Sequence, residues 1–224
     1  IPYLARQNPN MQVLASVRGK EILQSASARE TINAFSQISV DLLSNRKTMS
    51  GFDLNWRDDV PISTVQDGDE ITVGKYKLLV MAVPGHSSCS LAVYEPSLKA
   101  LFPSDAGGMP FADTCINSGN SNFTQYQEGL KRLAELKVNF YCADHCGFIH
   151  GEEAASFGKT AVASAQKMRA DIENTYYRLK DITKTTEEIT DKFYQAYPSY
   201  FLARSIMAGV IGQMVKHIVK GMTV

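Results

Sequence analysis

The chain of 224 residues is poor in cysteine, has no excess of either charge and contains no long apolar run. Lys and Arg together number 23, as do Asp and Glu, and this balance argues against nucleic acid or an anionic membrane as a partner. Four cysteines are too few for a disulfide-dense secreted scaffold. No apolar run approaches the ~18 residues needed to span a bilayer, and the first ten residues lack the pattern of a signal peptide. We therefore expect a cytoplasmic protein that binds small molecules or other proteins, with no membrane or nucleic-acid partner.

The hydrophobic patterns predict an α/β body in the first two thirds of the chain. We expect a strand at residues 11–16 and a long helix at residues 19–47, where apolar residues recur at helical spacing. A further helix at residues 124–137 precedes the buried strand VNFYCA. Between these helices the sequence has the pattern of β-strands, with short apolar runs joined by tight turns. This pattern predicts an antiparallel or mixed sheet. The runs are ISTV, ITV, YKLLVMAV, SLAVYE and KALF.

The last third of the chain has the pattern of helices alone. A long helix is expected at residues 152–180. Thr185 and Glu188 have the spacing of a capping box for a second helix, and Ser199 is expected to cap a last helix that stops at Gly221. This last helix is apolar over much of its circumference. We expect it to be buried against the body or in a homodimer interface.

Three candidate metal ligands follow directly after predicted strands. His86 comes after YKLLVMAV, Asp105 after KALF, and His145 after VNFYCA. Loops at strand ends are where a rigid sheet can direct side chains from distant parts of a sequence into one shared cleft. Two imidazoles and a carboxylate suit zinc, iron or manganese better than calcium or magnesium. The sequence therefore indicates a metal site, and single loop residues that are merely exposed are the alternative.

The run DGDEITVGKYKLLVMAVPGHSSCSLAVYEPSLKALFPSDAGG resembles the central part of the metallo-β-lactamase superfamily, and FYCADHCG is similar to its last His-bearing segment. The resemblance covers roughly residues 1–151 and implies the αββα sandwich of that family, an α/β fold. Residues 152–224 would be a helical extension that covers the cleft. The resemblance also implies two divalent metal ions, zinc first, with iron or manganese as alternatives. Asp105 would be the catalytic carboxylate that links both metals, with His86 completing one site and His145 the other.

The sequence departs from the family's pattern in four places, one of them Cys89, which stands where a glycine is usual after the PGH turn. It lacks the HxHxDH motif that supplies most ligands of the first metal, so we expect an upstream N-terminal segment of the same gene product to carry it. Ser104 stands where the family has a glycine before Asp105. The last segment stretches the usual Gly-His-Gly, so His150 is an alternative last ligand. We favour His145 because it lies nearer the strand end, where the fold is most rigid.

Other residues have simpler interpretations. One CxxxC pair, Cys142 and Cys146, is a poor match for structural zinc, so both are expected to be buried inert thiols. His217 on the last helix is expected to be structural or solvent-facing. The segment GGMPFADTCINSGNSN after Asp105 is expected to be an irregular loop that lines a substrate pocket or is solvated. Aromatic residues of the tail either wall this pocket or pack the tail onto the body. They are Tyr176, Tyr177, Phe193, Tyr194, Tyr197, Tyr200 and Phe201.

The resemblance implies a metal-dependent hydrolase that acts on a small molecule. Ester, thioester, lactone and phosphodiester bonds all fit this chemistry, and no residue in the motifs selects among them. Two alternatives stay open. One is a non-catalytic effector or binding protein that kept the fold with a degenerate site, and the other is a di-iron redox protein.

Overall fold

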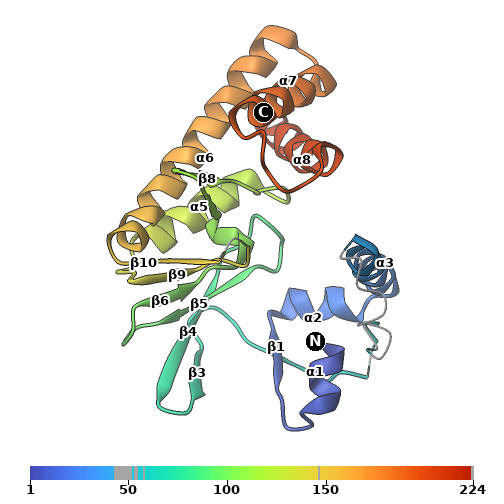
Figure 1. The fold of residues 1–224 in the computed structure, drawn as a ribbon, viewed down its shortest axis with the longest axis vertical. Helices are drawn as coiled ribbons and strands as arrows, with labels where there is room; N and C mark the ends of the chain where they lie inside the picture. Colours follow the sequence, from blue (N-terminus) through green and yellow to red (C-terminus); the bar gives the residue numbers. More distant parts are fainter. Residues whose placement is uncertain (43–51, 53–54, 58, 146, 223–224) are drawn as a thin grey trace. The chain divides into compact units, whose positions relative to one another are not determined.

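The computed structural model describes residues 1–42, 52, 55–57, 59–145 and 147–222. They form two compact units, Ile1–Gln66 and Asp67–Val224. The sequence-based division between residues 151 and 152 falls inside the second unit, where strands give way to helices (Figure 1). Within the described ranges, no helix is both long and apolar enough to cross a membrane.

The first unit has a small core between short strands and helices. Strands β1 and β2 pair in parallel, with Val13 opposite Ile62. These two residues pack with Trp56 and Val60, and the Trp56 indole Nε1 donates a hydrogen bond to the Leu23 carbonyl at 3.2 Å. The elements of this unit are α1 (Pro2–Gln7), β1 (Val13–Ala15), α2 (Val17–Gln24), α3 (Ala26–Leu42) and β2 (Ile62–Thr64).

The single helix predicted for residues 19–47 is wrong, because the chain breaks at Ser25 into α2 and α3. Ser25 has an extended backbone with ψ of 141°. Its Oγ accepts a hydrogen bond from Ala28 N at 3.2 Å and so caps the start of α3. Apolar residues keep helical spacing on both sides of this break, which conceals it in the sequence. Residues 43–47 lie outside the described residues.

The second unit is built on a mixed sheet of six strands in the order β10-β9-β6-β5-β4-β3, which confirms the predicted sheet type. Strand β6 pairs with β9 in parallel, and all other neighbours pair antiparallel. Strands β4, β6 and β9 therefore run in the same direction, and their carboxyl ends lie at the same end of the sheet. The strands are β3 (Glu70–Val73), β4 (Tyr76–Ala82), β5 (Leu91–Glu95), β6 (Ala100–Phe102), β9 (Phe140–Cys142) and β10 (Phe148–His150).

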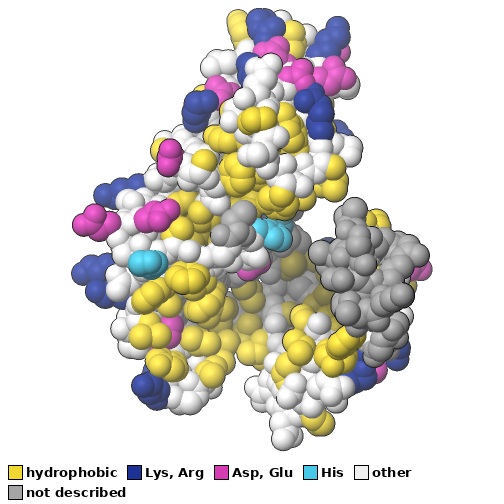
Figure 2. Space-filling model, in the orientation of Figure 1, with side chains coloured by type: hydrophobic (Ala, Val, Ile, Leu, Met, Phe, Trp, Pro, Cys, Tyr) yellow, Lys and Arg dark blue, Asp and Glu magenta, His cyan; other side chains and the backbone are white. Residues whose placement is uncertain are grey.

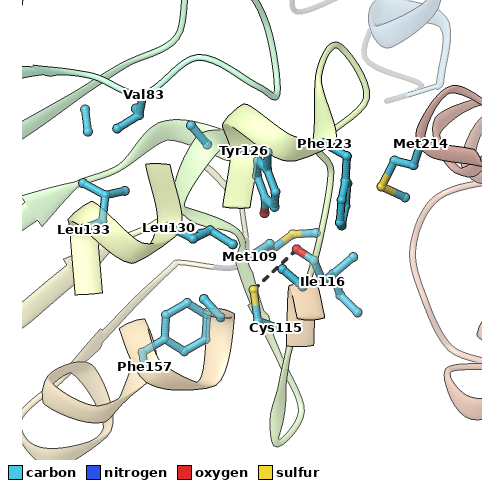
Figure 3. Packing of buried hydrophobic residues seen from close by; sticks show 14 of the residues in the cluster. Val83, Met109, Cys115, Ile116, Phe123, Tyr126, Leu130, Leu133, Phe157 and Met214 are labelled. Carbon is cyan, nitrogen blue, oxygen red and sulfur yellow. Dashed lines mark hydrogen bonds between the residues drawn. The ribbon is translucent and has the colours of Figure 1, made fainter. Parts of the chain in front are cut away.

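Helices pack on this sheet around one continuous hydrophobic core. Tyr126 and Leu130 of α5 and Phe157 of α6 surround the same apolar space (Figure 3). The core extends without interruption from Leu101 on β6 to Ile211 on the last helix, both almost completely buried. Residues 152–224 thus share their core with the sheet. The helices are α5 (Phe123–Ala134), α6 (Glu152–Leu179), α7 (Ile182–Ala196) and α8 (Arg204–Met222).

The segment after Asp105, predicted to be an irregular loop, contains regular structure. A 3₁₀ turn (η1, Ser104–Gly107) leads into a hairpin of β7 (Met109–Phe111) and β8 (Thr114–Ile116). Met109 and Ile116 face each other across the hairpin and are both buried. Burial of these side chains against the helices stabilises the hairpin. Its strands have three residues each and are too short to be recognised from alternation alone.

The helix starts in the tail also differ from those predicted. Helix α7 begins at Ile182 and is capped by Asp181, whose Oδ1 accepts from Lys184 N at 3.0 Å, so the predicted capping box is wrong. Thr185 is instead fully buried and donates its hydroxyl to the Asp181 carbonyl. Helix α8 begins at Arg204, so Ser199 does not cap it. Helix α6 confirms the long helix predicted at residues 152–180 within one residue.

Candidate metal centre

The predicted ligands lie together at the end of the sheet where three strands stop. His86 follows β4, Asp105 lies in η1 after β6, and His145 follows β9. The Nε2 atom of His86 lies 3.5 Å from Oδ2 of Asp105. On the other side, Nε2 of His145 lies 3.6 Å from Oδ1 of Asp105. Each oxygen of one carboxylate therefore faces a different imidazole.

These separations suit a shared metal better than a direct hydrogen bond. N–H···O hydrogen bonds are usually 2.7 to 3.2 Å long. Two ligand atoms of one tetrahedral zinc, each about 2.0 to 2.2 Å from the metal, lie roughly 3.4 Å apart. The side chains of His86 and Asp105 are each 29% exposed and that of His145 is 53% exposed, so a small solute can reach them. Histidine side chains also reach the face drawn in Figure 2, beside hydrophobic ones.

The ligand set on the described residues is incomplete. No group of three or more His, Cys, Asp or Glu side chains within the described ranges is arranged so that it could hold a metal ion. The two histidines approach different oxygens of Asp105 rather than one common point. These three side chains would therefore supply only part of a ligand set, and a metal ion held here would need further ligands.

The turn that carries His86 requires glycine at position 85. Gly85 has φ of +140°, and a Cβ atom there would come within 2.3 Å of Tyr126 N. The Gly85 carbonyl accepts hydrogen bonds from the amides of Ser121 and Asn122 at 3.0 and 2.9 Å. The close approach of two backbones thus fixes the turn against the start of α5. This fixed turn sets the position from which the imidazole extends.

Ser118 orients the His86 ring and was not singled out from the sequence. His86 Nδ1 lies 2.8 Å from the Ser118 carbonyl oxygen and 3.1 Å from its Oγ. Because a carbonyl oxygen only accepts, we assign the ring proton to Nδ1, which leaves the lone pair of Nε2 facing Asp105. Ser118 follows the end of β8, so the rule that drew attention to the three ligands applies to it too. The strand itself was not recognised.

The loop of Asp105 is supported by the strand that leads to His145. Tyr141 on β9 is buried, and its hydroxyl contacts the carbonyl oxygens of Gly107 and Gly108 at 2.6 and 2.9 Å. Burial raises the pKa of the Tyr141 phenol well above its ordinary value, so the phenol stays protonated and remains a donor. Ser104 has φ of +51°, in the left-handed region, which explains physically why glycine suits this position.

Asp144 is a second carboxylate beside the cluster that sequence reasoning did not single out. Partial desolvation raises the pKa of its carboxyl, and the negative charge of Asp105 raises it further. His145 and His86 act in the opposite direction. Asp144 therefore lies within electrostatic range of all three candidate ligands and adds to the negative potential that would attract a cation.

The remaining candidates lie apart from Asp105 or carry no reactive thiol. His150 lies on β10, where it pairs with Phe140 and its ring is 6.2 Å from that of Phe148. Cys142 is a free thiol but only partly buried, and desolvation raises its pKa. Burial raises the pKa of the Cys115 thiol to about 12. Cys146 lies outside the described residues.

One aromatic residue of the tail borders the candidate ligand His145. The ring of Phe201, between α7 and α8, lies 6.2 Å from the His145 ring and is 55% exposed. The neighbouring Tyr200 is buried, and its ring meets the ring of Phe111 of β7 edge to face, with the centroids 5.1 Å apart. Phe193 is buried in the same aromatic cluster. The tail aromatics thus mostly pack the tail onto the hairpin, and Phe201 borders the site.

His217 makes a structural contact, as predicted. Its Nδ1 accepts a hydrogen bond from the Phe123 amide at the start of α5, at 3.3 Å. Burial lowers the pKa of His217, and the positive charges of Arg169 and Lys220 lower it further. The neutral ring therefore serves as an acceptor that joins α8 to α5.

Comparisons with known proteins place this geometry in a known fold. No protein-family model matches the chain. The chain is 34% identical over 109 residues to a hydroxyacylglutathione hydrolase of Brucella anthropi, a match of 48% of this chain and 40% of the relative. A hydroxyacylglutathione hydrolase of Brucella ovis is 30% identical over 97 residues, which cover 36% of that protein. The chain thus matches less than half the length of these curated relatives.

Solved structures extend the likeness over nearly the whole chain. A metallo-beta-lactamase family protein from Thermus thermophilus aligns with a TM-score of 0.56 at 16% identity, covering 96% of this chain and 69% of that one. A beta-lactamase domain protein from Burkholderia ambifaria aligns with a TM-score of 0.57 at 14% identity, covering 96% and 60%. The chain therefore has the metallo-β-lactamase fold, a mixed α/β structure with C-terminal helices, and the predicted fold class is confirmed.

Proposed function

We propose that the protein is a metal-dependent hydrolase of the metallo-β-lactamase superfamily that cleaves an activated acyl bond, with a thioester as the first candidate. One observation carries the proposal. Both oxygens of Asp105 face an imidazole Nε2, at 3.5 and 3.6 Å, on strand ends that the sheet brings to one edge. The partial match to hydroxyacylglutathione hydrolases favours the thioester.

The residues have distinct roles in this proposal. His86, Asp105 and His145 hold two divalent ions, zinc first, with iron or manganese as alternatives, and the remaining ligands come from outside these three residues. When bound, such ions polarise the scissile group and make a nucleophile available at neutral pH. Ser118 fixes the tautomer and plane of His86 through its carbonyl oxygen. Phe201 offers an exposed apolar surface beside His145 to the acyl part of a small substrate.

The incomplete ligand set favours one alternative, a binding protein that kept the fold without catalysis. The two functions differ in their dependence on Asp105. A hydrolase loses turnover when this carboxylate is removed. A binding protein has no turnover to lose and retains its affinity for a small ligand.

Hydrolysis of a hydroxyacylglutathione thioester by the zinc-loaded protein, expressed together with the upstream segment that is expected to carry HxHxDH, tests the proposal. We expect thioester cleavage that falls at least a hundredfold in Asp105→Asn, because the substitution keeps the shape of the side chain but removes the charge. His150→Ala is the matched control and should retain full activity. Equal rates for the wild type and Asp105→Asn would overturn the proposal.

A further inference from the structure

Each loop of the candidate metal centre has a glycine close to its polar side chain. These glycines are Gly85 beside His86, Gly108 after Asp105, and Gly119 beside Ser118. At Gly85 a Cβ atom would come within 2.3 Å of Tyr126 N, and at Gly108 within 3.2 Å of the Tyr126 hydroxyl oxygen. At Gly119 it would come within 2.8 Å of Tyr126 Cβ and Cγ. Three loops of the site therefore close on one residue of α5.

Tyr126 meets these loops through the bulk of its ring rather than through a hydrogen bond. It is 1% exposed, and its hydroxyl oxygen is buried and has no hydrogen-bond partner of normal geometry within the described ranges. Burial raises the pKa of the phenol well above its ordinary value, the charge of Asp105 raises it further, and polar contacts with Ser118 oppose this. The phenol therefore stays neutral close to both residues. A buried hydroxyl without a partner costs free energy that a phenylalanine would not.

The first turn of α5 ties Tyr126 to the turn that carries His86. The Asn122 side chain accepts a hydrogen bond from Gln125 N at 3.0 Å and so caps the helix. Tyr126 N donates to the Asn122 carbonyl at 2.9 Å, and the Asn122 amide donates to the Gly85 carbonyl at the same distance. The backbone end of Tyr126 is therefore fixed against the His86 turn.

The other end of the Tyr126 ring reaches the loop of Asp105. Figure 3 shows the Tyr126 hydroxyl directed toward the hairpin of β7 and β8. A Cβ atom at Gly108 would lie 2.3 Å from Cys115 Sγ of this hairpin as well as close to the hydroxyl, so no side chain fits between them. The ring thus fills the space between the His86 turn and the Asp105 loop.

We propose that Tyr126 is a positioning residue for the metal centre, and that the bulk of its ring sets the separation of the loops that carry His86 and Asp105. This role rests on the proposed function, because it concerns the same site. A smaller side chain would leave a gap between the loops and let each move without the other. Metal ligands must be held within about 0.5 Å of their productive geometry, so looser loops would bind a metal ion more weakly.

Amide hydrogen exchange in the metal-free chain tests the packing without a metal ion. Three amides report on the loops because they donate to the carbonyl oxygens of Gly85 or Asp105. They belong to Ser121, Asn122 and Gly108. In Tyr126→Leu we expect these amides to exchange roughly tenfold faster than in the wild type, because local opening costs less free energy where packing is lost. Tyr126→Phe keeps the ring, so exchange should stay at the wild-type rate.

Ile211→Ala is the control for a general loss of stability. Ile211 is fully buried in the same core, on α8, and is not among the nearest neighbours of the three glycines. Like Tyr126→Leu, this variant removes buried apolar volume and should lower stability to a similar extent. Its effect on exchange should not be concentrated at the three reporter amides.

A second pair of variants leaves Tyr126 itself unchanged. A Cβ atom at Gly119 would collide with the Tyr126 side chain, so Gly119→Ala should displace the ring and speed exchange at the same three amides. Gly209→Ala is the matched control, because a Cβ atom at this position on α8 meets nothing within 4 Å. It should leave exchange unchanged.

Zinc affinity connects this packing to the metal centre, in the protein expressed together with the upstream segment that is expected to carry HxHxDH. Tyr126→Leu should bind zinc roughly tenfold more weakly, and Tyr126→Phe should bind it as the wild type does. Exchange and zinc affinity in Tyr126→Leu that match those of Ile211→Ala, with no effect of Gly119→Ala beyond that of Gly209→Ala, would overturn the proposal. A wild type that binds no zinc would overturn the proposed function alone, because the exchange measurement shows separately whether Tyr126 positions the loops.

Discussion

The chemical role proposed for Asp105 depends on the groups around it. The carboxylate is one of 23 acidic residues in the chain, and only its position after a strand distinguishes it in the sequence. In the structure each oxygen faces one imidazole, and the loop beneath it is held by the Tyr141 hydroxyl. Placement after strands therefore predicts that these three side chains lie together, whereas the contacts of Ser118 and Tyr141 become evident only once the loop geometry is known.

Replacement of Tyr141 by Phe tests whether the Tyr141 hydroxyl holds the Asp105 loop in place. The variant leaves the buried Gly107 and Gly108 carbonyls without their donor, so we expect the free energy of unfolding to fall by ~1–3 kcal/mol. We also expect zinc affinity to weaken roughly tenfold, because the Asp105 loop loses its anchor. Urea unfolding and zinc titration measure the two effects.

Tyr94→Phe is the matched control for that variant. Tyr94 is also buried, and its hydroxyl donates to the Lys137 carbonyl at 2.7 Å, away from the Asp105 loop. It should lose a similar amount of stability while zinc affinity stays unchanged. An equal loss of zinc affinity in both variants would show that Tyr141 has no specific role at the site.

Some helices and strands could be predicted from the sequence, and others could not. The strand at residues 11–16 and five of the six strands in the sheet of the second unit followed from short apolar runs and turns, whereas β10, which has no fully buried residue, was not predicted. Helix α6 followed from its length and periodicity. The break at Ser25, the hairpin after Asp105 and the cap of α7 depend on single hydrogen bonds or on burial by distant helices. Local sequence periodicity reveals neither these hydrogen bonds nor this burial.

The contact between α8 and α5 should make stability depend on pH. The pKa of His217 in the folded protein is lowered, so between that value and the ordinary value of 6.5 the unfolded chain binds a proton that the folded chain does not. The stability due to the neutral ring is therefore present above about pH 6.5. It is lost as the pH falls from there through the lowered pKa.

Urea unfolding at pH 8 and at pH 5.5 measures this dependence. In His217→Gln, the amide oxygen keeps an acceptor for the Phe123 amide but does not titrate. The variant should lose less stability than the wild type between the two pH values. Identical losses in both proteins would exclude His217 as the source of the dependence.

On the scale of the whole molecule, the tail and the sheet of the second unit share one core, and the candidate metal ligands lie where three strands that run in the same direction end. The family resemblance anticipated the fold from a PGH turn and an aspartate that each follow a strand. It did not anticipate how far Phe201 would reach towards His145. That contact depends on the path of the chain between α7 and α8, which no motif specifies.

Zinc titration of the wild-type chain and four variants tests the central claim most directly. The variants are His86→Ala, Asp105→Ala, His145→Ala and His150→Ala. If His86, Asp105 and His145 form the metal centre, zinc affinity falls at least tenfold in each of the first three and stays at the wild-type value in His150→Ala. Unchanged affinity in Asp105→Ala, or a loss in His150→Ala that His145→Ala does not share, would contradict the account.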